Sequence, residues 1–108
     1  MSSTKPYPSK FGTNPPGPCV LFCKADWCGF CTKAKPEIAE AARRMGSVVP
    51  VYVIDADKQE KIVNGLGVQG FPTIFYVDQN GRKHEYGGDR TGRAISEWVC
   101  NKVGSCMR

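Results

Sequence analysis

Two cysteines separated by two residues, Cys28 and Cys31, have a spacing that suits redox chemistry. Thiols at this spacing can close a small disulfide when they lie in the first turn of a helix. A short apolar run, 19–23, precedes them, and a helix-forming stretch from Thr32 to Met45 follows. This context places Cys28 at a helix N-terminus, where free backbone N–H groups and the helix dipole favour a thiolate. Because the thiolate is the form that attacks disulfides, the motif predicts dithiol–disulfide exchange.

The rest of the sequence predicts the elements that would position this pair. In chain order these are a strand at 19–24, a helix at 29–45, a strand at 48–54, a helix at 58–64, two strands at 73–77 and 82–86 joined by a tight turn, and a helix at 91–103. The order βαβαββα predicts an α/β protein whose mixed four-stranded central sheet is flanked by helices on both faces.

The first 18 residues differ in composition from the rest of the chain. They hold five of the eight prolines. Proline lacks an amide donor and biases the residue before it away from helix, so we expect a proline-rich, extended arm at 1–18. Tyr7 and Phe11 could hold that arm against a single domain at 19–108. At 108 residues, the chain has room for one core.

Charge and hydropathy exclude several classes of function. The net charge is +5, but the basic residues are scattered and no nucleic-acid-binding signature accompanies them. They predict a solvated surface or, alternatively, steering toward acidic partners. No apolar run approaches the ~18 residues that a membrane span needs. The N-terminus lacks the apolar block of a secretory signal, so we expect a cytoplasmic location, with packaging or export by another route left open. We also expect a monomer.

Several motifs together resemble the thioredoxin family, which includes the domains of protein disulfide isomerases. They are Trp-Cys-Gly-x-Cys after a buried strand, a proline eight residues after the first cysteine, and Phe-Pro-Thr at 71–73. The similarity runs from about Val20 to Val103. It implies a thioredoxin-like fold, shortened at its N-terminus because a proline-rich arm cannot supply the family's first helix. It also implies that Cys28 is the attacking thiol and Cys31 the resolving thiol.

The resemblance also implies which residues surround the dithiol. Trp27, Gly29 and Phe30 would border it, and Phe71-Pro72 would form a cis-proline loop that pairs with the substrate backbone. Gly87 would let that backbone approach the site. For Trp27, the alternative is that its indole simply packs against the domain. For Pro72, the alternative is a trans proline that opens an edge strand.

The chain departs from the family pattern at two positions near the dithiol. Phe30 replaces the proline or histidine usual between the cysteines, which predicts only moderate stabilisation of the thiolate and favours a reductase over an oxidant. Phe22 stands where the family usually has a buried acid. Asp26 is a candidate proton relay, and Arg90 is a candidate for lowering the pKa of Cys31. Solvated side chains are the alternative for both.

The remaining cysteines carry no clear redox spacing. Cys19 and Cys23 are expected to be buried thiols. Cys100 and Cys106 are expected to be free thiols, with a regulatory disulfide or a dimer link as the alternative. The spacing of these four cysteines and the lone His84 matches no zinc pattern, so we expect no metal. We also expect no bound cofactor.

The leading functional hypothesis is therefore a thiol–disulfide oxidoreductase that acts on protein disulfides. Its electrons would come from an external thiol reductant or from a thioredoxin reductase. Two alternatives remain. One is a protein-binding module that holds a partner on the apolar rim of Trp27, Phe30, Phe71 and Pro72 without redox turnover. The other is a disulfide oxidant or isomerase.

Overall fold

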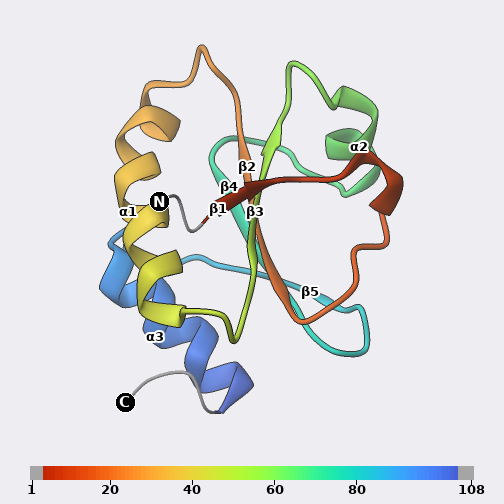
Figure 1. Ribbon diagram of the computed structural model, residues 1–108. Helices are drawn as coiled ribbons and strands as arrows, with labels where there is room; N and C mark the ends of the chain where they lie inside the picture. The colour runs from red at the N-terminus through yellow and green to blue at the C-terminus, as the bar shows by residue number, and fades with distance from the viewer. Residues whose placement is uncertain (1–3, 105–108) are drawn as a thin grey trace.

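The computed structural model describes residues 4–104, which form a thioredoxin-like α/β fold (Figure 1). Its elements are β1 (Thr4–Pro6), a 3-10 turn (Ser9–Phe11), β2 (Cys19–Lys24), α1 (Gly29–Met45), β3 (Val51–Asp55), α2 (Glu60–Gly65), β4 (Thr73–Val77), β5 (Lys83–Glu85) and α3 (Gly92–Val103). None of the helices between residues 4 and 104 is long and apolar enough to cross a bilayer.

The sheet is mixed, as predicted, but it has five strands rather than four, in the order β1-β3-β2-β4-β5. β2 lies at its centre, parallel to β3 and antiparallel to β4. The additional strand is β1, which pairs in parallel with β3 at one edge, with Thr4 opposite Val51. The prediction missed β1 because it is only three residues long and includes Pro6, and proline argues against a strand. An edge strand such as β1 nevertheless tolerates proline.

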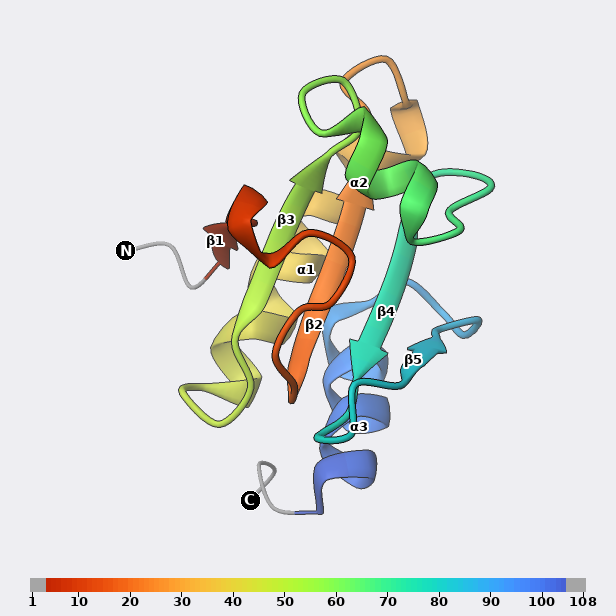
Figure 2. The same cartoon turned by 90° about the vertical axis from the view of Figure 1, so that its right-hand side faces the viewer.

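Alternating side chains of β2 enter two separate hydrophobic clusters. Val20 and Phe22 pack with buried residues of α1 and α3, whereas Cys19, Leu21 and Cys23 pack on the opposite face with residues of the N-terminal arm and α2. Figure 2 shows α1 and α3 behind the sheet and α2 with the arm in front of it. The period of two along this fully buried strand therefore fixes how the helices cover the sheet.

The N-terminal arm packs against the sheet through aromatic residues. Tyr7 is 3% exposed and makes edge-to-face contacts with Phe11 and Tyr52, at ring-centroid distances of 5.5 and 6.0 Å. Its hydroxyl donates to the Gly12 carbonyl at 2.7 Å, and the Gln59 amide donates to the Tyr7 carbonyl at 2.9 Å. The division of the chain at residue 18 stays a prediction.

The helix that leads away from β3 starts later than the sequence suggested. The sequence predicts a helix at 58–64, but α2 begins at Glu60. The N–H groups of Lys58 and Gln59 bond instead to the Asp55 carbonyl in a turn, and the Asp55 side chain accepts from the Asp57 N–H. By contrast, the last helix begins within one residue of its predicted start, and the Thr91 hydroxyl caps it by accepting from the Ala94 N–H at 3.1 Å.

We predict that Gly17→Ala destabilises the protein by about 1–3 kcal/mol, because the added methyl group would overpack a closed site. A Cβ at this position would lie 1.9 Å from the Asp78 carbonyl oxygen, which belongs to the backbone and cannot move aside. Urea denaturation measures the loss. Gly70→Ala is the matched control, since its Cβ would meet nothing within 4 Å. Equal stability of the two variants would contradict this packing.

Candidate active site: the Cys28–Cys31 dithiol

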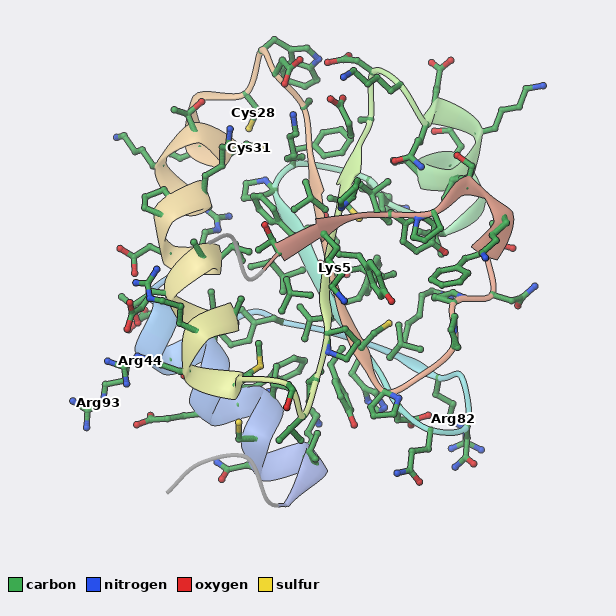
Figure 3. All side chains as sticks on the ribbon, in the orientation of Figure 1. Lys5, Cys28, Cys31, Arg44, Arg82 and Arg93 are labelled. Atoms are coloured by element: carbon green, nitrogen blue, oxygen red, sulfur yellow. The ribbon has the colours of Figure 1, made fainter. Side chains whose placement is uncertain are left out.

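The two cysteines of the motif lie together at the N-terminal end of α1, beyond the carboxyl end of β2 (Figure 3). Cys28 is the N-cap residue of α1, with extended backbone angles, and its Sγ accepts a hydrogen bond from the Cys31 N–H at 3.2 Å. The sequence therefore placed Cys28 correctly at the start of the helix. A sulfur in this position receives the unpaired amide donors of the first turn.

The surroundings of Cys28 favour its ionised form. The pKa of the Cys28 thiol is lowered, first by a hydrogen bond from the Cys31 side chain. Burial, the second-largest effect, opposes this, and the N–H groups of Cys31 and Phe30 and the charge of Arg90 lower the pKa further. Charge-assisted hydrogen bonds of this kind stabilise an anion more than they stabilise a neutral thiol. Cys28 is therefore the better nucleophile of the pair.

Cys31 has the opposite character. It is 1% exposed, and its pKa is raised, mainly because burial penalises the thiolate and also because its thiol hydrogen-bonds to Cys28. An N–H bond from Ala25 and the charge of Arg90 act in the opposite direction. The two thiols thus differ in burial and in the direction of their pKa shifts, with the lowered pKa on Cys28 and the raised pKa on Cys31.

Two exposed aromatic side chains border the dithiol. Trp27 is 73% exposed and Phe30 is 63% exposed, while Cys28 between them is 6% exposed. The Trp27 indole meets the Phe71 ring edge to face, at 5.8 Å between centroids. Phe71 also packs against the cluster formed by Ala25, Cys28 and Cys31. Trp27 and Phe30 are thus exposed on either side of Cys28, and Phe71 packs beside the dithiol; their contact with substrate stays a prediction.

The loop around Pro72 forms one wall of a pocket of about 480 Å³. The Phe71–Pro72 peptide bond is cis. Gly87, Gly88 and Arg90, from the segment between β5 and α3, line the same pocket. A Cβ at Gly87 would meet nothing within 4 Å, so the space beside this residue is open. Because glycine has no side chain, another backbone could approach Gly87 there. The structure therefore brings Pro72, Gly87 and Arg90 together, although they are distant in sequence.

A buried phenylalanine, Phe22, occupies the position where the family usually has a buried acid. Phe22 is 1% exposed and lies in register with Val53 on β3. The nearest charged pair along these strands is two residues further on, where Lys24 lies in register with Asp55 and donates to its carboxylate at 3.1 Å. This ion pair was not foreseen. Its sequence signal is the opposite charges at matching ends of two parallel strands.

Asp26 lies in this charged group rather than against the sulfur atoms. Its carboxylate is 69% exposed and accepts from Lys24 Nζ at 2.6 Å. Carboxylate oxygens of Asp26, Asp55 and Asp57 lie within 4.8 Å of one another. The positive charge of Lys24 already partly neutralises the group. These contacts tie the Asp26 carboxylate to Lys24 and give no support to a relay role.

The other described cysteines lie away from the dithiol. Cys19 and Cys23 are free, fully buried thiols, as predicted, and burial raises the pKa of each to about 12. They are therefore poor nucleophiles. Cys100 is disulfide-bonded, so the expectation of a free thiol there is wrong. Cys106 lies outside the described residues.

The chain belongs to the thioredoxin family, whose model matches residues 10–101. It is similar to protein disulfide-isomerase A6 of Mesocricetus auratus, with 47% identity over 72 residues, which are 66% of this chain and 16% of that protein. It is also similar to protein disulfide isomerase-like 1-5 of Oryza sativa subsp. japonica, with 38% identity over 89 residues, 80% of this chain and 16% of that protein. The chain thus spans a small part of these relatives.

Among solved structures, the fold resembles that of the J-Trx1 fragment of ERdj5, with a TM-score of 0.83 at 15% identity, over 94% of this chain and 52% of that one. These similarities overturn one prediction. Protein disulfide-isomerase A6 is a protein of the endoplasmic reticulum, which points away from the cytoplasmic location expected from the sequence. The absence of an apolar block near Met1 was not a sufficient basis for that expectation.

Proposed function

We propose that this protein is a thiol–disulfide oxidoreductase that acts on disulfides of protein substrates through Cys28 and Cys31. The observation that carries the proposal is the position of the Cys28 sulfur, which caps α1 and accepts from the Cys31 N–H while its pKa is lowered. The similarity to protein disulfide isomerases supports this class of reaction.

The proposed reaction has two exchange steps. The Cys28 thiolate attacks one sulfur of a substrate disulfide, forming a mixed disulfide and releasing the other substrate sulfur as a thiolate, which takes a proton from water. Cys31 then loses its proton to water and attacks the Cys28 sulfur. The Cys28–Cys31 disulfide forms, and the second substrate sulfur leaves. The substrate has gained two electrons, and the protein has lost two.

We propose that the protein works as a monomeric reductase. An external thiol reductant or a thioredoxin reductase would return the two electrons. Strong oxidants of this kind owe their potential to a very stable thiolate in the reduced form. Here burial opposes the lowering of the Cys28 pKa, so we expect only moderate stabilisation of the Cys28 thiolate and of the reduced form. Phe30 offers no charge of its own. An oxidant or isomerase would use the same two exchange steps in a different balance.

Substrate is proposed to lie across the mouth of the dithiol. The exposed rings of Trp27 and Phe30 would contact its apolar side chains, and its backbone would pass Gly29 and approach Phe71, Pro72 and Gly87. The pocket next to Pro72 has room for a side chain that neighbours the disulfide.

A protein-binding module without turnover is the second candidate, because Trp27 and Phe30 are the large apolar side chains most exposed among residues 4–104. Reduction of insulin by dithiothreitol, followed by turbidity, separates the two. The wild type is expected to accelerate precipitation, whereas a Cys28→Ser/Cys31→Ser double variant follows the rate of dithiothreitol alone. Equal curves for the two proteins would leave only the binding role.

A further inference from the structure

The residue between the cysteines contacts a cation from another part of the chain. The Arg90 guanidinium carbon lies 5.9 Å from the centre of the Phe30 ring, which is within the range of a cation–π contact. Phe30 belongs to the first turn of α1, and Arg90 lies in the segment between β5 and α3. The contact therefore joins the dithiol turn to the wall of the pocket beside Pro72.

We propose, on the basis of the function above, that Phe30 is a positioning residue whose ring holds the Arg90 guanidinium beside the dithiol, where the arginine stabilises the thiolates of Cys28 and Cys31. Phe30 carries no charge, so it would act only through the arginine. Phe30 stands where the family usually has a proline or a histidine. Arg90, a cation from the segment between β5 and α3, would then compensate for this difference.

The arginine has few other restraints on its side chain. Among the residues the structure describes, no carboxylate lies within salt-bridge distance of Arg90. Its backbone is held on both sides, by the Tyr86 hydroxyl, which donates to the Asp89 carbonyl, and by Thr91, which caps α3. The backbone thus positions Arg90 near the dithiol, and the Phe30 ring contacts its long side chain.

The charges around the dithiol make Arg90 the relevant cation. Its field lowers the pKa of both Cys28 and Cys31. On the β2 side, Lys24 is paired with Asp26 and Asp55. Lys33 is exposed on α1, and the carboxylate of Asp89 belongs to the arginine's own segment. An arginine suits this role because its planar guanidinium can stack on an aromatic ring.

Titration of the Cys28 thiolate in the reduced protein, by absorbance at 240 nm and by the rate of iodoacetamide alkylation, tests this inference. Phe30→Leu keeps the backbone N–H and an apolar side chain but removes the ring. It is expected to lower the thiolate fraction about threefold at a pH below the titration midpoint, the size of an exposed cation–π contact. Arg90→Met should lower it at least as much. Phe30→Tyr should leave it unchanged.

A double-mutant cycle identifies the route of the effect. In the Arg90→Met background, Phe30→Leu is expected to change nothing further. Arg93→Met is the matched control, because Arg93 lies three residues on and pairs with Glu97 at 3.1 Å. No change with Phe30→Leu, or the same threefold loss in both backgrounds, would overturn the inference. The titration needs no turnover, so failure of the insulin assay would contradict the proposed function without altering this result.

Discussion

Replacing Cys31 with serine should convert turnover into a lasting covalent complex between Cys28 and its substrate. Cys28 keeps its position at the start of α1 and its N–H donors, so the first exchange step proceeds. The second step needs the sulfur of residue 31 and cannot occur. One substrate should be captured per protein molecule, and insulin reduction should fall to the rate of the reductant alone. Non-reducing gels and mass spectrometry measure the capture.

The controls for this prediction use the other thiols of the same protein. Cys28→Ser should capture nothing, because Cys31 is 1% exposed and its pKa is raised. Cys19→Ser should behave as wild type, since Cys19 is a fully buried thiol on β2. Capture through Cys31 in the Cys28→Ser variant, or no complex with Cys31→Ser, would contradict the assigned roles.

Truncation of Phe22 to alanine is expected to lower the free energy of unfolding by about 3–5 kcal/mol. Phe22 is among the largest fully buried side chains of the described chain and packs with residues of α1 and α3. Removing the ring loses its burial and leaves a cavity that rigid neighbours on the sheet can fill only in part. Urea denaturation of the reduced protein measures the loss.

Phe30→Ala provides a control of the same residue type. The Phe30 side chain is 63% exposed, so its truncation should cost less than about 0.5 kcal/mol, as for most surface substitutions. If Phe22→Ala were as stable as Phe30→Ala, Phe22 would not be part of the core, and this packing would be contradicted.

Local sequence signals were enough to predict most of the fold. The bounds of β2, α1 and β4 follow from continuous apolar runs and a capped helix, and the structure has the same bounds. The turn at 78–81 also followed from its residues, since the Asp78 carboxylate accepts from the N–H groups of Asn80 and Arg82. By contrast, β1 depends on pairing with β3, 47 residues away at Thr4 and Val51, and three residues of arm give no periodicity to detect.

The dithiol was predictable because its chemistry lies within one helical turn. Its surroundings were predicted only in part. The Lys24–Asp55 pair requires the register of two parallel strands, and the contact of Phe30 with Arg90 requires the path of the segment between β5 and α3. Neither quantity is encoded in the spacing of residues along the chain.

Equilibration of the protein with glutathione buffers of graded potential, followed by alkylation and peptide mass mapping, tests the central claim most directly. We predict that a reversible disulfide joins Cys28 to Cys31 and that its midpoint potential is more negative than that of strong protein oxidants, with about 30 mV corresponding to about 1.4 kcal/mol. Cys19 and Cys23 should stay reduced throughout. Alkylation of both Cys28 and Cys31 in the most oxidising buffer would contradict the account.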